Sequence, residues 1–494
     1  MNFQVLYSVL QGIFSLYGIF IMVAGVSIGI LGGATPGIST TMTMAIVAPM
    51  TYTMEPLWAI TMLASLAVGG VYGGSISATI LNLPGTPASA ATALEAYPLA
   101  KSGEAERALS FNVISSTFGN SIGVVLLIVF IPVIVAFALL FGPWEMFLFA
   151  FFGITICANL SRANFIKGLM ASLIGLFISC IGMDPLLGTT RFAFGSTYLS
   201  AGVSIIPAMI GLFGLSEVFL NLSVLRGEVI PIKRYRVFEF KFWFQYKWLA
   251  LKCSILGFLI GVIPGVGPDI ASWVGYDYAR SSSKEKEKFG KGSYEGIVGS
   301  ESANNACVPG AYAPLLTLGV PGSAGGAIVM GILMIHGIRP GPMFLATNPE
   351  WLYQIAIALF LAGILLLFIG SVLSKIIVKI LVVPVNVIMI GVVLLCVIGA
   401  FGLNFRIQDV YLMFFFGILG LLMKKFEFPI APMVLGIILG GTLSEANFRR
   451  ALMLADGSII PFFTRPVSLI LVIVIVFLLT KDIVINKIKS YKLS

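Results

Sequence analysis

The chain has 494 residues, of which 58% are hydrophobic and only 10% are charged, and its mean hydropathy is +1.03. Soluble domains are about 45–50% apolar and about 25% charged, so this composition excludes a water-soluble protein. Because a transmembrane helix takes about 20 apolar residues, the sequence predicts an all-α polytopic membrane protein with about 10–12 transmembrane helices plus re-entrant or broken helices.

The first predicted transmembrane repeat spans residues 1–225. No charged residue precedes Glu55, and none lies between Glu55 and Glu95. Gly and Pro interrupt this apolar sequence at 32–39 and 82–87. Pro removes a backbone donor and Gly tolerates non-helical backbone, so we expect helices to break at both places.

A basic segment, residues 226–252, follows the first repeat. It carries seven Lys or Arg residues against two Glu residues. Lys and Arg are enriched in cytoplasmic loops, so this connecting segment is predicted to be cytoplasmic. The formal charge of +9 therefore indicates membrane topology and not a nucleic-acid partner.

The second predicted repeat spans residues 253–460 and resembles the first. Gly/Pro interruptions recur at 261–268 and 318–326. Three pairs of segments match in the same order, which indicates an internal duplication: 29–39 with 257–267, 83–88 with 320–325, and 207–217 with 432–445. The uncharged N-terminus is predicted to lie outside, whereas the second half begins at the cytoplasmic segment. Repeats that enter the membrane from opposite faces are inverted, so the sequence predicts inverted repeats. Residues 461–494 are predicted to add one helix and a basic cytoplasmic tail.

The matched interruptions are candidates for a binding site. Irregular backbone inside a bilayer survives only where protein buries it or where it lines a wet cavity. Interruptions at matching places of two repeats are typical of a transporter's midplane site, and simple helix kinks are the alternative. Helix N-termini and hydroxyl groups bind carboxylates without Lys or Arg. The predicted substrate-binding residues are Thr35, Gly37, Ser39, Thr40, Asn82, Gly85, Thr86, Gly265, Gly267, Asn304, Asn305, Gly322 and Ser323.

The same segments offer oxygen ligands for a small cation. Carbonyls, hydroxyls and carboxylates suit hard cations, and Na⁺ is similar in size to Ca²⁺. The predicted Na⁺ ligands are Asp269, Pro36, Pro264 and Ser75. The alternative for Asp269 is an N-cap of the helix that follows.

Four more residues have two interpretations each. Glu301 precedes a long uncharged stretch and suits structural pairing or ion coupling equally. His336 is more typical of a helix end than of a proton carrier. Asp184 and Arg191 indicate a structural turn at an interface, and partner docking is the alternative.

Several kinds of chemistry are excluded. A single His cannot form a bis-His haem site or an H-E-x-x-H zinc site, and the five Cys form no C-x-x-C pair. The segment 289–293 lacks the spacing of a phosphate-binding loop. We therefore expect no enzyme and no cofactor apart from Na⁺ as the coupling ion. An ion channel, or a proton-coupled carrier of another small solute without a binding protein, is the alternative.

At these residues the sequence resembles the large membrane subunit of the tripartite tricarboxylate transporters, the TctA family. The resemblance covers essentially the whole chain, and it is carried by segments 32–40, 72–75, 82–87, 97–104, 264–268, 289–292, 295–296, 301–306, 318–323 and 339–342. Glu95 and the pair Pro268-Asp269 depart from the family pattern, which weakens the case for Asp269 as a ligand.

The resemblance implies a cation-coupled secondary importer of organic di- or tricarboxylates in the bacterial inner membrane. It implies two protein partners, a small four-helix membrane subunit like TctB and a periplasmic substrate-binding protein like TctC. It also implies that the large subunit moves its site across the membrane in an elevator-like manner. The binding protein would largely set the specificity, so the resemblance does not name the carboxylate.

Overall fold

The computed structural model describes residues 3–160, 165–184, 186–221, 239–380 and 385–491. Most of these residues are helical, and strands β1 (Gly182–Met183) and β2 (Thr190–Arg191) form one short antiparallel pair. The prediction of an all-α protein is confirmed. Residues 226–238 of the predicted basic connecting segment and Lys492 of the predicted tail lie outside the described residues.

The chain divides into two compact units. Unit 1 is Met1–Val135 with Ile206–Leu421, and unit 2 is Ala136–Ile205 with Leu422–Ser494. Each unit therefore takes one segment from either half of the sequence. The boundaries predicted near 225, 252 and 460 separate repeats along the sequence. A division into compact units does not test them, so they stay a prediction.

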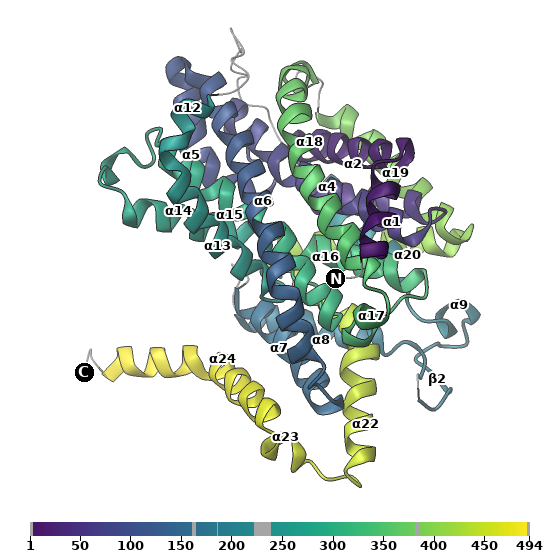
Figure 1. Ribbon diagram of the computed structural model, residues 1–494. Helices are drawn as coiled ribbons and strands as arrows, with labels where there is room; N and C mark the ends of the chain where they lie inside the picture. Colours follow the sequence, from purple (N-terminus) through teal and green to yellow (C-terminus); the bar gives the residue numbers. More distant parts are fainter. Residues whose placement is uncertain (1–2, 161–164, 185, 222–238, 381–384, 492–494) are drawn as a thin grey trace. The chain divides into compact units, whose positions relative to one another are not determined.

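Unit 1 contains most of the long helices (Figure 1). Its main helices are α1 (Phe3–Ile13), α2 (Leu16–Ala34), α3 (Thr40–Val47), α4 (Pro56–Leu81), α5 (Ala90–Leu99), α6 (Ala105–Ala138), α13 (Lys247–Val262), α14 (Gly267–Ser282), α15 (Tyr294–Leu318), α16 (Ala324–Ile335), α18 (Glu350–Ile380), α19 (Val385–Asn404) and α20 (Ile407–Lys425). The last residues of α6 and α20 belong to unit 2.

Shorter elements connect these helices. The short α-helices are α10 (Ile205–Met209), α11 (Ser216–Asn221), α12 (Phe240–Trp243) and α17 (Pro342–Thr347). The 3₁₀ turns are η1 (Ala48–Thr51), η2 (Pro87–Ser89), η5 (Phe244–Tyr246) and η6 (Lys286–Lys288), and the π-helical turns are η3 (Ala100–Glu104) and η4 (Ile210–Leu215).

Local sequence explains where the long helices begin. Ser15 accepts a hydrogen bond from the Gly18 N–H at the start of α2, and Ser293 does the same for Gly296 at the start of α15. Pro56 occupies the first position of α4, where its missing N–H costs no helical hydrogen bond.

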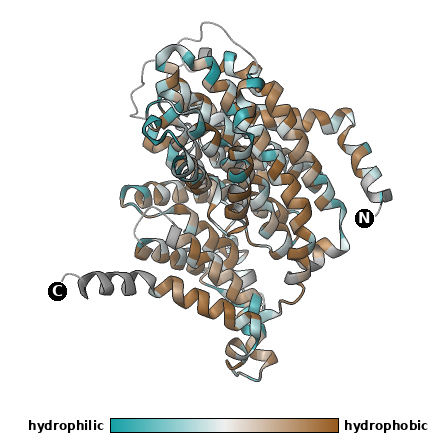
Figure 2. Ribbon diagram, turned by 60° about the vertical axis from the view of Figure 1, so that its left-hand side comes forward, coloured by the Kyte–Doolittle hydropathy of each residue, from teal (hydrophilic) through white to brown (hydrophobic). Residues whose placement is uncertain are grey.

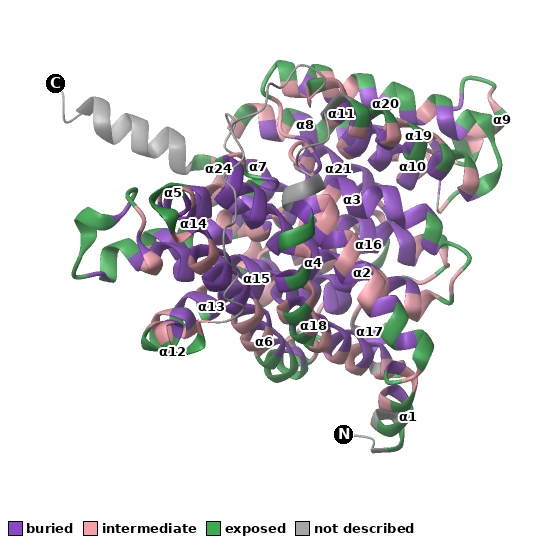
Figure 3. Ribbon diagram, turned by 90° about the horizontal axis from the view of Figure 1, so that it is seen from above, coloured by how far each residue is buried: buried purple, intermediate pink, exposed green. Residues whose placement is uncertain are grey.

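Small residues let helices of unit 1 pack backbone against backbone. A methyl group placed on Gly29 of α2 would lie 2.2 Å from the carbonyl oxygen of Leu66 in α4. One placed on Gly257 of α13 would lie 2.1 Å from the carbonyl oxygen of Ala303 in α15. Both α4 and α15 are buried along most of their length, as Figure 3 shows in purple. These two helices form the centre of unit 1.

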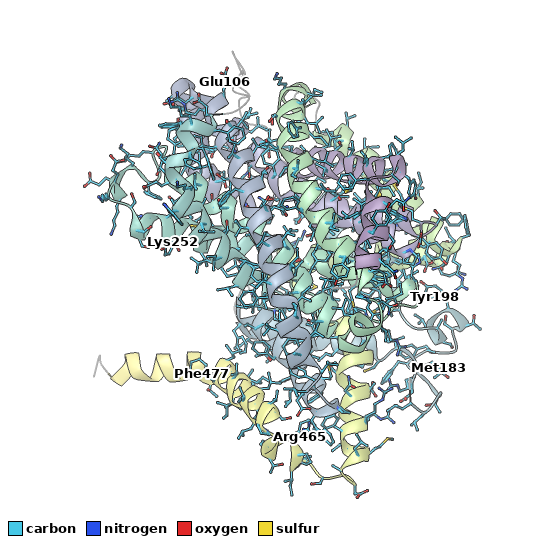
Figure 4. All side chains as sticks on the ribbon, viewed as in Figure 1. Glu106, Met183, Tyr198, Lys252, Arg465 and Phe477 are labelled. Atoms are coloured by element: carbon cyan, nitrogen blue, oxygen red, sulfur yellow. The ribbon has the colours of Figure 1, made fainter. Side chains whose placement is uncertain are left out.

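Unit 2 contains the β1–β2 pair and helices that are mostly shorter than those of unit 1. Its elements are α7 (Pro143–Leu160), α8 (Phe165–Ser179), α9 (Thr197–Ser200), α21 (Ile430–Leu439), the π-helical turn η7 (Gly440–Glu445), α22 (Ala446–Leu454), α23 (Pro461–Thr464) and α24 (Pro466–Tyr491). Helix α8 packs against α21, and α7 packs against α22 and α24. Figure 4 labels Met183 in β1 and Arg465 directly before α24.

The composition and length of the helices suit a membrane. Among the described residues, six helices are long and apolar enough to cross a bilayer: Leu16–Ala34, Pro56–Leu81, Pro87–Ala136, Glu350–Ile377, Val387–Asn404 and Ile407–Lys425. Figure 2 shows apolar residues along most of the helices. Shorter apolar helices include α8, α16 and α21. The chain is a multi-pass membrane protein, and the expected total of 10–12 spans stays a prediction.

Candidate functional site

Helices end and restart at each of the four predicted interruptions, within one residue of the predicted bounds. In the first half, α2 ends at Ala34 before α3 begins at Thr40, and α4 ends at Leu81 before η2 begins at Pro87. In the second half, α13 ends at Val262 before α14, and α15 ends at Leu318 before α16. All four breaks belong to unit 1, and we call residues 35–39, 82–86, 263–266 and 319–323 together the break cluster.

The two breaks of each half touch one another through backbone. The carbonyl oxygen of Gly33 lies so close to Gly85 that an added methyl group there would be 2.0 Å from it. In the second half, the Gly265 N–H donates to the carbonyl oxygen of Pro321 at 3.2 Å. A methyl group on Gly322 would lie 2.5 Å from the carbonyl oxygen of Gly261. Glycine is therefore required on both sides for the backbones to approach.

Contacts between the halves join the two pairs of breaks. Helix α14 packs against η2, and α16 packs against α3. A methyl group on Gly325 in α16 would lie 2.9 Å from the sulfur of Met44 in α3. The breaks thus form one connected cluster, so the structure brings together segments that lie up to about 290 residues apart.

Several of the predicted hydroxyl ligands serve the backbone. Ser39 caps α3 by accepting from the Met42 N–H at 3.1 Å, and Ser323 caps α16 by accepting from the Gly326 N–H at 3.1 Å. The Thr35 hydroxyl donates to the Leu31 carbonyl at 2.7 Å. Thr86 and Ser89 form a capping box at η2. Ser39 and Ser323 thereby define where α3 and α16 begin.

Three buried polar atoms near the breaks form no hydrogen bond with any described residue. They are the Thr40 Oγ1 at the start of α3, the Ser272 Oγ in α14 and the Asn305 Oδ1 in α15. Buried polar groups are nearly always paired, so each such group requires an explanation. Thr40 and Asn305 are among the substrate-binding residues predicted from the sequence, and Ser272 follows the third break in the chain.

Left-handed backbone conformations explain why Asn or Gly occupies several of the other predicted positions. Asn82 is exposed and ends α4 with a left-handed φ of 56°, and Gly37 has a φ of 85°. Asn221 of α11 donates to the carbonyl oxygen of Gly37 at 3.4 Å. Gly265 and Gly267 have φ values of 77° and 71°. At these positions Gly or Asn is needed for the turn itself.

The two adjacent amides of α15 lie side by side. Asn304 donates to the carbonyl oxygen of Ala88 at 3.4 Å, so it contacts η2, which directly follows the second break. Asn305 donates to the Asn304 Oδ1 at 2.7 Å and to the Glu301 carbonyl at 3.3 Å. Both residues are fully buried. Asn304 therefore links the centre of α15 to the break cluster.

The predicted Na⁺ ligands differ in their exposure. Asp269 is exposed and is the third residue of α14, whose N-cap is Val266. The N-cap interpretation of Asp269 is wrong, because the turn around Gly265 and Gly267 lets the helix begin earlier. Pro264 is buried, Pro36 is half-buried, and Ser75 lies inside α4.

Ser75 contacts Glu301. Its hydroxyl donates to the Glu301 Oε1 at 2.5 Å. The hydroxyls of Thr92 and Ser116 donate to the same carboxylate, at 2.5 and 2.7 Å. Glu301 therefore has the hydrogen-bond partners that the structural interpretation requires. Sequence reasoning missed Thr92 and Ser116, which lie on separate helices far from Glu301 in the chain.

Glu95 forms a second buried carboxylate site, which the sequence indicated only as a departure from the family pattern. It accepts from the N–H groups of Gly290, Gly292 and Ser293 at 2.6, 3.0 and 2.7 Å. The Tyr276 hydroxyl donates to it at 2.7 Å. Glu95 thus joins α5 to the loop before α15 by hydrogen bonds.

Asp184 and Arg191 lie in unit 2 in the predicted turn, which the β1–β2 pair confirms. The Arg191 guanidinium donates two hydrogen bonds to Glu445, at 2.6 and 2.9 Å. Arg449 donates to Asp184 at 2.6 Å. These four charges compensate one another within unit 2.

The ion pairs of this turn predict a pH dependence. The N–H groups of Leu187 and Leu186 and the Arg449 guanidinium lower the pKa of Asp184 below its ordinary value of about 3.9. The ionised form therefore stabilises the fold above about pH 4, and this stabilisation is lost as the pH falls through the lowered pKa. We expect Asp184→Asn to have a lower Tm than wild type at pH 7. Thermal unfolding from pH 7 to pH 3 checks whether the difference shrinks below about pH 4; a constant difference would contradict it.

His336 lies at the C-cap of α16, as its helix-end interpretation predicts. Its ring lies 5.9 Å from that of Tyr52, centroid to centroid. Among the described residues, no three His, Cys, Asp or Glu side chains form a group that could bind a metal ion. A cation site built from these residues would therefore combine hydroxyl, amide or carbonyl oxygens with at most two such side chains.

Comparison with known proteins agrees with the sequence resemblance. Residues 19–435 match the model of the tripartite tricarboxylate transporter TctA family. An Agrobacterium vitis protein described as "Uncharacterized 52.8 kDa protein in TAR-I ttuC' 3'region" is 33% identical over 450 residues, 90% of this chain and 89% of that protein. A second A. vitis protein, "Uncharacterized protein in TAR-II ttuC' 3'region", is 35% identical over 212 residues, 43% of this chain and 87% of that protein. No solved structure matches the chain. The chain belongs to the tripartite tricarboxylate transporter TctA family.

Proposed function

We propose that the chain is the permease subunit of a Na⁺-coupled secondary transporter that imports small organic di- or tricarboxylates across the bacterial inner membrane. The observation that carries the proposal is the connected cluster of four helix breaks in a chain of the TctA family. The partners are a small four-helix membrane subunit and a periplasmic substrate-binding protein. The proposal includes no catalytic step.

The break cluster has the chemistry that a carboxylate needs. The N-termini of α3, α14 and α16 begin there, and each carries a partial positive charge and unpaired N–H groups. The Thr40 and Ser272 hydroxyls are free to donate. Residues 35–39, 82–86, 263–266 and 319–323 contain no Lys or Arg. Helix dipoles and hydroxyls would hold the anion, and Na⁺ would compensate its charge.

The proposal includes two inverted repeats and an elevator-like movement. Matched elements support the repeats: α2 packs on α4 as α13 packs on α15, and the π-helical turns η4 and η7 occur in the matching segments 207–217 and 432–445. The close backbone packing of both helix pairs favours movement of the pairs as rigid bodies.

Uptake by proteoliposomes tests the proposed function. Purified permease with its small subunit is reconstituted, and labelled citrate or another di- or tricarboxylate is added with the binding protein, with and without an inward Na⁺ gradient. We expect uptake only when both the binding protein and the gradient are present. Uptake that needs neither would contradict the proposal.

Two substitutions test the position of the site. Asn305→Ala removes an amide from the buried face of α15, and Asn82→Gly removes a side chain while keeping the left-handed backbone at the end of α4. Glycine is used because Ala at a φ of 56° would itself cause strain. We expect both variants to insert normally and to lose most uptake, at least about 10-fold. Normal uptake by both would show that the substrate binds elsewhere.

A further inference from the structure

Glu301 is a fully buried carboxylate that hydroxyl groups surround. The donors come from three different helices: Ser75 from α4, Thr92 from α5 and Ser116 from α6. Together with Glu301 on α15, four helices of unit 1 meet at one point. We call these four residues the Glu301 site.

No positive side chain balances this carboxylate. Among the described residues, no Lys, Arg or His lies within ion-pair distance of Glu301. By contrast, Glu145 and Asp184, which are buried in unit 2, each have an Arg partner, and Glu95 in unit 1 has three backbone N–H donors. A buried ionised carboxylate is costly unless a cation compensates it. Three hydroxyl donors reduce this cost but leave the net charge in place.

A second observation points to a metal cation rather than to a proton. The Asn112 Oδ1 and the Asn305 Oδ1 are fully buried acceptors that form no hydrogen bond with a described residue. Both amides touch the Glu301 site: Asn112 donates to the Ser75 carbonyl at 3.3 Å, and Asn305 donates to the Glu301 carbonyl at 3.3 Å. Amide, hydroxyl and carboxylate oxygens in excess of donors are the ligands of a hard cation. One proton on the carboxylate would leave both amide oxygens unpaired.

We propose that the Glu301 site binds the Na⁺ that drives transport, with Glu301 as its anionic ligand and Ser75, Thr92 and Ser116 as hydroxyl ligands. This inference rests on the proposed function, and it replaces Asp269 as the charged Na⁺ ligand. Asp269 is exposed, whereas the Glu301 site is closed from lipid and water.

The position of the site explains how Na⁺ would act on the substrate. Thr92 lies on α5, which follows the second break after the short turn η2. Asn304, three residues after Glu301, donates to the Ala88 carbonyl in η2. Na⁺ would therefore hold α5 and η2 against α15 and order the second break. Substrate that binds there would in turn strengthen Na⁺ binding, because coupling between two sites is reciprocal.

Na⁺-dependent thermal unfolding of the purified protein tests the site without substrate or binding protein. Tm is measured from 0 to 300 mM NaCl, with choline chloride keeping the ionic strength constant. A ligand that binds only the folded state raises Tm with its concentration, so the wild type is expected to gain stability with Na⁺. Glu301→Gln keeps the size of the side chain and should weaken Na⁺ binding at least about 100-fold. Ser116→Ala, which keeps the carboxylate, should weaken it about 10-fold. The control Glu287→Gln, in an exposed loop, should respond as the wild type does.

The outcomes are distinct. If the Tm of both Glu301→Gln and Ser116→Ala still rises with Na⁺ as in the wild type, the inference is overturned. It is also overturned if the Tm of the wild type does not change with Na⁺. A Tm that instead rises with acidity in the wild type, but not in Glu301→Gln, would also overturn it and assign a proton to Glu301. If Glu301→Gln does not fold, the Na⁺-dependent change in the Tm of Ser116→Ala tests the inference instead. Failure of uptake with an intact Na⁺ response would contradict the proposed function alone.

Discussion

A single methyl group at Gly85 is expected to abolish transport. In Gly85→Ala the new Cβ would lie 2.0 Å from the carbonyl oxygen of Gly33 and 2.6 Å from the Ser77 Oγ. The first of these atoms is backbone, so the first and second breaks must move apart. Overpacking of this kind costs about 1–3 kcal/mol, and here it also displaces the proposed binding segments. Uptake by proteoliposomes and Tm measure the two effects.

Gly391→Ala is the matched control for this substitution. Gly391 lies inside α19, and an added methyl group meets no atom within 4 Å. Because Ala favours a helix over Gly, this variant is expected to keep full uptake and an unchanged or slightly higher Tm. Equal uptake by Gly85→Ala and Gly391→Ala would mean that the close contact at Gly85 has no part in transport.

Loss of the Glu95 carboxylate is expected to cause the largest loss of stability. Glu95→Ala leaves the N–H groups of Gly290, Gly292 and Ser293 without their acceptor. An unpaired buried donor costs about 1–3 kcal/mol, and this cost applies in full to the buried Ser293 N–H and in smaller part to the more exposed Gly290 and Gly292. We expect a Tm lower by several degrees and poor recovery from the membrane, measured by thermal unfolding and by yield of folded protein.

Two variants separate the hydrogen bonds from general effects of charge. Glu95→Gln keeps one acceptor oxygen and should fall between Glu95→Ala and wild type. Glu287→Ala removes an exposed carboxylate from the neighbouring loop and should have the Tm of wild type. A wild-type Tm for Glu95→Ala would show that the loop 289–293 is held by other contacts.

The helix breaks could be predicted from the sequence because their cause is local. The interruptions expected at 32–39, 82–87, 261–268 and 318–326 contain helix ends at Ala34, Leu81, Val262 and Leu318 or begin directly after them. Pro and Gly act on the backbone of their own residue and its neighbours, so no knowledge of tertiary contacts is needed. The exact start of a helix is harder to predict: α14 begins at Gly267, two residues before Asp269, the candidate N-cap.

The partners of the buried carboxylates could not be predicted, because they come from distant segments. Ser75, Thr92 and Ser116 lie 226, 209 and 185 residues from Glu301. Nothing distinguishes these hydroxyls in the sequence from the many others in apolar helices. The same holds for the loop N–H groups around Glu95, because any residue except Pro supplies such a donor.

The ion pairs of unit 2 have a consequence for biosynthesis. Glu145 accepts from Arg465, 320 residues later, and Asp184 accepts from Arg449, 265 residues later. Because the ribosome adds about 5–20 residues per second, Glu145 and Asp184 are synthesised roughly 10–60 s before their Arg partners. Until then water or the insertion machinery must solvate them. Unit 2 therefore closes only after α22 and the start of α24 have emerged from the ribosome, and chains that terminate before Arg449 should be degraded rather than accumulate.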